Sequence, residues 1–149
     1  GRDEAFWTNS VDNPARRSWS GYAFEQLCFN HIPQIKECLG IRGVLSNVCS
    51  WSCPADRVKG KKGHQIDMII ERRDQVINVC EAKFTTAPYI LTEKYLLELN
   101  ERIEDFRSSV KTSYAIHLTI IASSGLADNE YSHQVQSVVT LKDLMSYQR

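Results

Sequence analysis

Three features that would decide the class of this protein at once are missing from its sequence. The 149 residues include 18 basic and 18 acidic side chains, so no net charge points to a nucleic acid, a membrane surface or an acidic substrate. No apolar run reaches the roughly 18 residues of a membrane span, and no signal-peptide pattern stands at the start. The glycine-rich phosphate loop of ATPases is also absent, so we expect no ATPase activity from these residues.

The sequence also lacks a cysteine pattern typical of a disulfide framework or a zinc site. The five cysteines are Cys28, Cys38, Cys49, Cys53 and Cys80. An odd number, with three members inside apolar patterns, favours reduced thiols in the cytoplasm over disulfides. Only Cys49 and Cys53 are closely spaced, and zinc would need further ligands than a stray His64. We therefore expect buried or half-buried free thiols and a cytoplasmic location.

The composition that is present suits one folded domain. Hydrophobic residues make up 42% of the chain and aromatic residues 9%, which is enough for a core at this length. The chain opens with Gly-Arg-Asp and has no initiator methionine, so we expect it to be part of a longer protein. Residues 1–18 are irregular and are predicted to be a linker or arm from a missing N-terminal region. Residues 19–149 are then a single domain.

Two helices are indicated by apolar residues at spacings of three and four. The first runs from a cap at Ser18 or Ser20 to Gly40, and Pro33 should kink or divide it. The second, over 92–110, is strongly amphipathic, with charged residues covering its other side.

Strand-like runs surround the second helix. Residues 41–53, 66–84 and 114–123 are rich in β-branched side chains, and 66–84 reads as a β-hairpin. Residues 135–140 predict one more strand, and 141–147 a short terminal helix. We therefore expect an α/β fold, a mixed β-sheet of about four to five strands flanked by helices.

The stretch Gly63–Phe84 carries charges where a strand interior should be apolar. Its first run contains Asp67, and its second contains Glu81 and Lys83, which are two apart and so point the same way. A three-residue loop at 73–75 would set Asp67 opposite Glu81. In that register two carboxylates and one ammonium lie on one face, whereas a slip of one residue separates them.

These residue types suit a divalent metal. Mg²⁺ prefers oxygen ligands, commonly one or two carboxylates with waters and a substrate phosphate. Asp67 and Glu81 would provide the carboxylates, and Glu25 on the first helix would complete the shell. Lys83 would orient or deprotonate an attacking water, or stabilise charge on the phosphate. The structural alternative is a Glu–Lys pair on a strand face and a surface Glu25 paired with a cation.

A basic loop over residues 54–63 leads into this stretch. Its cations are Arg57, Lys59, Lys61 and Lys62. A phosphate backbone could be received there, and a solvated connection is the plainer alternative.

The order of these features resembles the PD-(D/E)XK nuclease superfamily, which has the restriction-endonuclease-like fold. A helix with an acid and a strand are followed by Ile-Asp on the next strand, Glu-x-Lys on the third, and an amphipathic helix and strand. More closely, GYAFEQLCFNHIPQIKECLGI, GHQIDMIIER and VINVCEAKF resemble the C-terminal domain of a group of bacterial AAA-type ATPases. Ile66 stands where the superfamily motif has proline, at a position that touches no ligand.

The resemblance implies a role for each matching residue. Glu25 would be the helix-borne acid, and Asp67 and Glu81 the metal carboxylates. Lys83 would be the catalytic lysine, with Gln65 assisting from the side of Asp67.

Partners and cofactors follow from the same resemblance. They are Mg²⁺ or Mn²⁺, DNA, and an N-terminal ATPase region of the full-length protein, with no membrane. Three functions stay open: a nuclease, a catalytically inactive nuclease-fold module for DNA docking or protein interaction, and a structural domain whose four residues form an ion-pair cluster.

Overall fold

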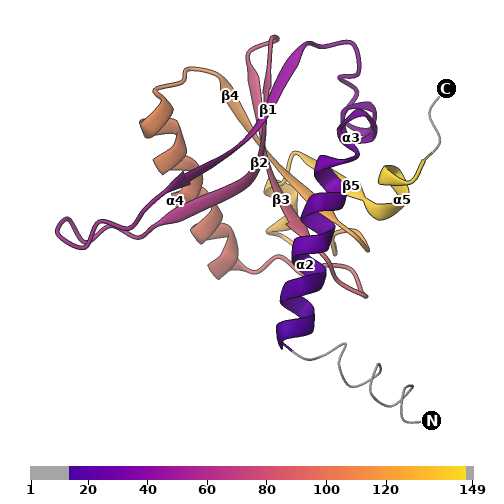
Figure 1. Ribbon diagram of the computed structural model, residues 1–149, viewed down its shortest axis with the longest axis horizontal. Coiled ribbons are helices and arrows are strands. Elements are labelled where there is room, and N and C mark those ends of the chain that lie inside the picture. Colours follow the sequence, from indigo (N-terminus) through magenta and orange to yellow (C-terminus); the bar gives the residue numbers. More distant parts are fainter. Residues whose placement is uncertain (1–13, 147–149) are drawn as a thin grey trace.

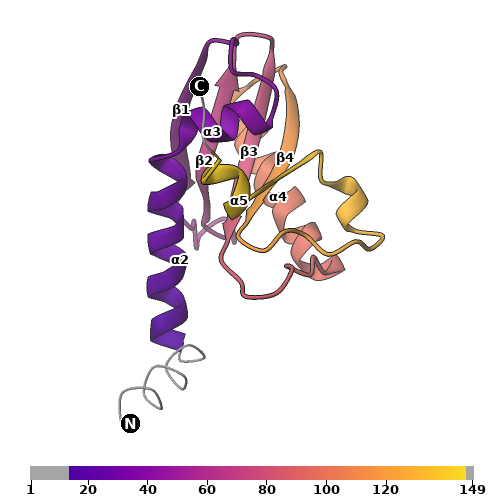
Figure 2. The ribbon, with the colours of Figure 1, turned by 90° about the vertical axis from the view of Figure 1, so that its right-hand side faces the viewer.

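The computed structural model describes residues 14–146 as a three-layer α/β fold, with one five-stranded sheet between helices (Figures 1 and 2). In chain order the elements are α2 (Pro14–Phe29), α3 (Ile32–Cys38), β1 (Ser46–Cys53), β2 (His64–Arg72), β3 (Val76–Lys83), α4 (Glu93–Val110), β4 (Ala115–Ala122), the 3-10 helix η1 (Ser132–Gln134), β5 (Ser137–Thr140) and α5 (Leu141–Leu144). The predicted α/β fold, with a mixed sheet flanked by helices, is confirmed. Within the described residues, no helix combines the length and apolar character that a membrane span requires.

The sheet joins two kinds of strand pairing, in the order β1-β2-β3-β4-β5. Strands β1, β2 and β3 form an antiparallel meander, whereas β4 and β5 are added in parallel. A parallel neighbour requires a crossover, and α4 supplies the one between β3 and β4. The inner part of β4, Leu118 to Ala122, is buried, as its continuous apolar run predicts for a strand covered on both faces.

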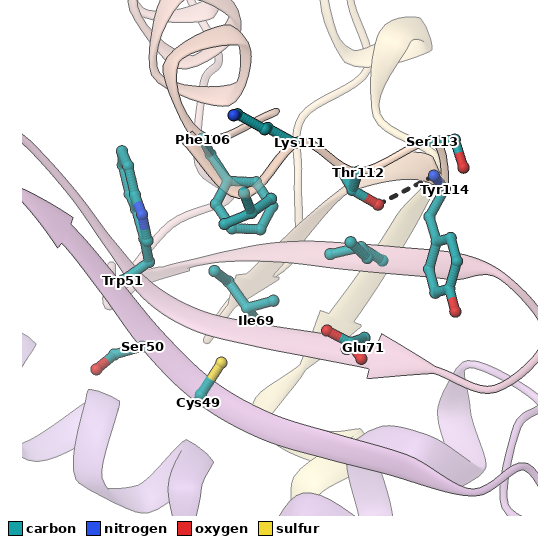
Figure 3. Close-up of a pocket in the computed structure, with 12 residues that line it drawn as sticks. Cys49, Ser50, Trp51, Ile69, Glu71, Phe106, Lys111, Thr112, Ser113 and Tyr114 are labelled. Atoms are coloured by element: carbon teal, nitrogen blue, oxygen red, sulfur yellow. Dashed lines mark hydrogen bonds between the residues drawn. The ribbon is translucent and has the colours of Figure 1, made fainter. Parts of the chain in front are cut away.

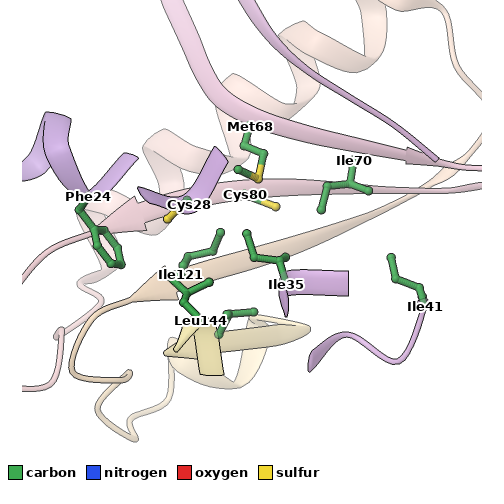
Figure 4. Packing of buried hydrophobic residues seen from close by; sticks show 10 residues of the cluster. Phe24, Cys28, Ile35, Ile41, Met68, Ile70, Cys80, Ile121 and Leu144 are labelled. Carbon is green, nitrogen blue, oxygen red and sulfur yellow. The ribbon is translucent and has the colours of Figure 1, made fainter. Parts of the chain in front are cut away.

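Helices α2, α3 and α5 cover one face of the sheet, here named the α2 face, and α4 covers the other, named the α4 face. The core on the α2 face, of which Figure 4 is a close view, consists of Phe24, Cys28, Ile35, Ile41, Met68, Ile70, Cys80, Ile121, Val139 and Leu144. The α4 face has two clusters: Leu91, Leu96, Leu99, Leu118, Ile120 and Ala122, and then Ile66, Ile69, Ile77, Val79 and Phe106. The amphipathic stripe predicted for 92–110 thus lies on the sheet.

The β2–β3 turn has the predicted length. Strand β2 ends at Arg72 and β3 begins at Val76; between them, Gln75 has φ 68° and donates its N–H to the Arg72 carbonyl at 3.2 Å. A left-handed residue at the end of a three-residue loop suits the twist of a hairpin. The predicted register is confirmed over the paired residues, and the pairing ends where Met68 faces Cys80.

A β-bulge interrupts β2 on its other side. The pairing with β1 shifts by one residue, so that Asp67 and Met68 together face a single residue of β1. Because of this extra residue, Ile66 and Ile69 both pack on the α4 face although they are three apart, while Met68 packs on the α2 face. The bulge therefore breaks the alternation at the position of Asp67.

Several element ends differ from prediction. Helix α2 begins at Pro14, so residues 14–18 of the predicted linker are helical; proline suits a first turn because its missing N–H would have no helical partner there. Residues 1–13 lie outside the described part. Strand β1 begins only at Ser46, and α5 is shorter than predicted, ending at Leu144.

Other end signals act as the sequence predicts. Pro33 opens α3 and so divides the first helical stretch, and Gly40, at φ 73°, follows its end. Thr92 caps α4 by accepting a hydrogen bond from the Tyr95 N–H at 3.2 Å. Thr140 caps α5 through a reciprocal pair with Asp143.

The packing on the α2 face gives a stability prediction. Ile70 is fully buried, so truncation to alanine should lower the free energy of unfolding by about 2–5 kcal/mol. The matched control is Leu45→Ala, because the Leu45 side chain is 73% exposed and should change stability little. Urea unfolding followed by circular dichroism measures both, and equal midpoints for the two variants would contradict the assigned core.

Candidate functional site

Two of the predicted site residues meet on the α2 face. Glu25 comes from α2 and Asp67 from the bulge in β2, and their carboxyl groups share a hydrogen bond. Gln65 Nε2 donates to Asp67 Oδ1 at 3.1 Å, so the predicted assisting residue also reaches Asp67. The carboxyl groups open onto a narrow, mostly apolar pocket, whose other lining residues are Cys28, Phe29, Met68, Cys80, Ala82 and Ile121.

The electrostatics of Glu25 link this pair to the rest of the predicted site. Burial first, then the charge and hydrogen bond of Asp67, raise the pKa of Glu25 to about 7 from its ordinary 4.5. The Glu81 carboxylate raises this pKa further, and the Lys83 ammonium lowers it. The charges of Asp67, Glu81 and Lys83 therefore all act on Glu25, whose carboxyl group keeps its proton up to about pH 7.

Glu81 is held on the α4 face by three donors. Its carboxylate is buried, with the residue 6% exposed. The Tyr95 hydroxyl donates to Oε1 at 2.6 Å, Lys83 Nζ lies 3.5 Å from the same oxygen, and Arg102 Nη1 donates to Oε2 at 3.3 Å. A buried carboxylate needs such partners, because leaving it unpaired is costly. Burial and the Glu81 charge raise the pKa of Tyr95 well above its usual range, so its hydroxyl stays a donor.

Lys83 and Arg102 complete this cluster. Lys83 Nζ lies 4.3 Å from the centroid of the Tyr95 ring and 5.6 Å from that of Tyr89, within cation–π distance. Arg102 Nη1 also donates to the Gln65 carbonyl at 3.1 Å. One guanidinium thus joins α4 to both β2 and β3.

The predicted metal role of Glu25, Asp67 and Glu81 stays a prediction, and the structure shows how these three carboxyl groups lie. The bulge turns Asp67 toward Glu25 on the α2 face, so Asp67 does not face Glu81 across the hairpin. Glu81 remains with Tyr95 and Arg102 on the α4 face. Within residues 14–146, no three His, Cys, Asp or Glu residues are close enough to share a metal ion.

The Glu25–Asp67 pair fits a divalent cation by its own chemistry. Its two carboxyl groups are within hydrogen-bond reach, and partial burial, then the Asp67 charge, raise the pKa of Glu25 to about 7. Mg²⁺ commonly binds through one or two carboxylates and completes its shell with waters and phosphate oxygens. Glu25 and Asp67 are therefore the two carboxyl groups that meet, whereas Glu81 is engaged by Tyr95 and Arg102.

Tyr95 and Arg102 were missed by sequence reasoning, which assigned Arg102 to the solvent side of its helix. The side chain of Arg102 is only 15% exposed. Tyr95 and Arg102 are seven residues apart, so they lie on one side of α4. The burial of Tyr95 and Arg102 could have been predicted from Glu81. A carboxylate inside an apolar strand requires hydrogen-bond donors, and the helix that follows the strand is the nearest element that can provide them.

A larger pocket on the α4 face contains none of the predicted site residues (Figure 3). It has a volume of about 390 Å³ and lies between β1, β2 and the C-terminal end of α4, near Tyr114. The rings of Trp51 and Phe106 meet edge-to-face at one side, with centroids 5.5 Å apart. No local sequence pattern predicts this pocket, because it forms between the C-terminal end of α4 and the strands β1 and β2.

The predicted DNA-contacting cations stand apart from both pockets. Arg57, Lys59, Lys61 and Lys62 are all exposed. They lie at the end of the hairpin that β1 and β2 form beyond the sheet (Figure 1).

Comparisons with known proteins establish the fold and no more. No protein-family model and no curated protein matches the chain. The crystal structure of AF1548, a protein of unknown function, is similar with a TM-score of 0.50 at 16% sequence identity. The similarity covers 80% of this chain and 58% of AF1548, so the chain spans less than two thirds of that protein.

The raised pKa of Glu25 gives a pH prediction. Between the ordinary value of 4.5 and about 7, folded Glu25 holds a proton that the unfolded chain has lost. The free energy of unfolding should therefore fall as pH rises through this window. Glu25→Gln removes this dependence, so the Tm of the variant relative to the unmodified protein should increase from about pH 5 to about pH 8. A Tm difference that stays constant over this range would contradict the raised pKa of Glu25 and its contact with Asp67.

Proposed function

We propose that the chain is a PD-(D/E)XK-type domain that hydrolyses DNA phosphodiesters with Mg²⁺ or Mn²⁺, and that it is the C-terminal part of a bacterial AAA-type ATPase in the cytoplasm. The observation that carries the proposal is the hydrogen-bonded Glu25–Asp67 pair, with Lys83 in electrostatic reach of it. Perturbed carboxyl groups beside a lysine, next to strand ends, are typical of catalytic sites.

Glu25 and Asp67 would hold the cation. When bound, a divalent cation supplies Lewis-acid stabilisation of the charge that develops on a phosphate, and it acidifies an attacking water. It would also displace the Glu25 proton, since a cation next to a carboxyl group favours the ionised form.

The remaining residues position charge around the phosphate. Lys83 carries the ammonium that would face phosphate oxygens, and its contacts with Glu81 and the Tyr95 ring fix its place. Glu81 acts through Lys83, and Tyr95 in turn orients Glu81. Preorganised positive charge of this kind is a large part of catalysis of phosphoryl transfer.

A second candidate, a nuclease-fold module that docks DNA or protein without cleaving it, is favoured by one observation. Glu81 is saturated by Tyr95, Lys83 and Arg102, so it is not available as a ligand unless these contacts break. In this alternative the cluster is structural and binding to DNA requires neither a metal nor Asp67.

A cleavage assay separates the two candidates. Plasmid and branched DNA should be nicked in the presence of Mg²⁺ or Mn²⁺, and Asp67→Asn and Lys83→Ala should each lower the rate by about 10²–10⁴-fold. The matched control is Lys142→Ala, since Lys142 is exposed on α5, outside the described site. Cleavage that survives unchanged in Asp67→Asn and Lys83→Ala would exclude the proposed site.

Metal binding is tested independently of turnover. At about pH 8, Mg²⁺ should raise the Tm of the unmodified protein, because a ligand that binds only the folded state stabilises it. Asp67→Asn and Glu25→Gln should abolish this shift, whereas Glu81→Gln should retain it if the pair alone holds the ion. An equal Mg²⁺-induced shift in all of these variants would show that the cation binds elsewhere.

A further inference from the structure

The β1–β2 hairpin extends beyond the sheet as a narrow, hydrogen-bonded ribbon (Figure 1). Beyond the last β1–β2 pair, Asp56 and Lys61 face each other and exchange backbone hydrogen bonds of 3.0 and 2.8 Å. Gly63 suits this stem, because a Cβ there would lie only 3.0 Å from the Ala55 nitrogen and 3.2 Å from the Cys53 carbonyl oxygen. The extension is therefore a continuation of the two strands and has a defined shape.

The tip of the ribbon is closed by a tight turn. Asp56 Oδ1 accepts the N–H groups of Val58 at 3.1 Å and Lys59 at 3.2 Å, as aspartate does in turns. Gly60, at φ 65°, donates to the Arg57 carbonyl at 3.3 Å. The Asp56 carboxylate, the only acid of the tip, is thus engaged by backbone N–H groups of the turn.

Charge and apolar surface are arranged together on this tip. Residues 54–63 carry four cations, Arg57, Lys59, Lys61 and Lys62, against Asp56 alone, in a chain whose total charge is balanced. Val58 stands between Arg57 and Lys59 and is 97% exposed. An apolar side chain so exposed and flanked by cations contributes nothing to the core, so its position suits contact with a partner.

The root of the ribbon is anchored to α4. His64 is 9% exposed, and its Nε2 lies 2.9 Å from Asp105 Oδ2. Glu101 is also near, with Oε1 4.0 Å from the same nitrogen. These acids repel phosphates at the root, so an anionic partner is confined to the outer half of the ribbon.

We infer that this hairpin is a two-stranded β-ribbon that enters a groove of duplex DNA, with its cations on the phosphates and Val58 against the base or sugar surface. The inference rests on the proposed function for its DNA partner and adds the form of the substrate. The major groove of B-DNA, about 12 Å wide, admits a two-stranded β-ribbon. In A-form RNA the corresponding groove is deep and narrow, which excludes it.

Single strands are disfavoured by the composition of the ribbon. Proteins that bind single-stranded nucleic acid stack bases on aromatic side chains, and residues 54–63 contain no Phe, Trp or Tyr. The ribbon is also short enough for one duplex to contact both its tip and the proposed site. From Lys59 to Asp67 the chain spans at most about 26 Å at about 3.3 Å per residue, which is less than the roughly 34 Å turn of a duplex.

The test measures binding of the whole 149-residue chain without divalent metal, so that no cleavage intervenes. Fluorescence anisotropy compares a duplex DNA with its single strand, the matching duplex RNA, and heparin as a competitor. The variant carries Arg57→Gln, Lys59→Gln, Lys61→Gln and Lys62→Gln. Its affinity for duplex DNA should fall by about tenfold or more, and the slope of log K against log salt should lose about 3 to 4 units.

A matched control removes the same number of exposed cations elsewhere, by Arg73→Gln, Lys94→Gln, Lys111→Asn and Lys142→Gln. Asparagine is chosen for Lys111 because that residue has φ 53°. The control should bind duplex DNA as the unmodified chain does. Equal losses in the two quadruple variants would overturn the inference, and so would equal affinity for duplex DNA and duplex RNA.

The tip is tested by Val58→Ser, which cannot disturb the core. Groove entry predicts a several-fold loss of affinity for duplex DNA with an unchanged salt slope, because only an apolar contact is removed. Groove entry would be overturned if Val58→Ser bound duplex DNA as tightly as the unmodified chain does. It would also be overturned if heparin competed as well as duplex DNA at equal charge, because the ribbon would then be a nonspecific cationic surface.

Failure of this inference can be told apart from failure of the proposed function. Binding is measured without divalent metal and cleavage with it, so the two readouts are independent. If duplex DNA binding depends on the four cations but no cleavage is observed, the nuclease proposal is rejected and the DNA-binding role of the ribbon stands. If cleavage is observed and does not depend on the four cations, the DNA-binding role of the ribbon is rejected and the nuclease proposal stands.

Discussion

The buried carboxylate of Glu81 is the constraint around which much of this domain is arranged. A charge at the centre of the sheet must be neutralised where water is excluded, and the three groups that do so are Lys83 on the same strand and Tyr95 and Arg102 on α4. Arg102 also binds the Gln65 carbonyl of β2. The same contacts therefore fix the position of the long helix over the sheet and the end of the strand that carries Asp67.

From the sequence, Glu25, Asp67 and Glu81 were predicted to form one metal-binding group, whereas the structure places Glu81 apart from the other two. Glu81 serves the α4 face, and the polar pair of Glu25 and Asp67 serves the α2 face. Lys83 stands at the strand end between them, where its charge reaches Glu25. The proposed chemistry then needs only two ligands from the protein, because waters and phosphate oxygens complete the shell of a hard cation.

The elements that the sequence predicted well are those with a local cause. The β2–β3 register follows from a three-residue loop, and the start of α4 from the Thr92 cap. The bulge at Asp67 has no local signal, since it depends on how β1 pairs with β2, and neither a glycine nor a proline marks it. Arg102 was misassigned for a related reason: its charge suggested solvent, and only the tertiary position of Glu81 explains its burial.

The mixed sheet has a consequence for the order in which the chain can assemble. Strands β1, β2 and β3 are consecutive and close through short connections, so their pairing demands little loop entropy. Strand β4 pairs with β3 only after the 18-residue α4 has been laid across the sheet, and β5 needs a further crossover through η1. Contacts of long sequence separation form late in such topologies. The ribbon and the bulge that bears Asp67 thus belong to the half that can form first, whereas Tyr95 and Arg102, the partners of Glu81 on α4, belong to the half that follows.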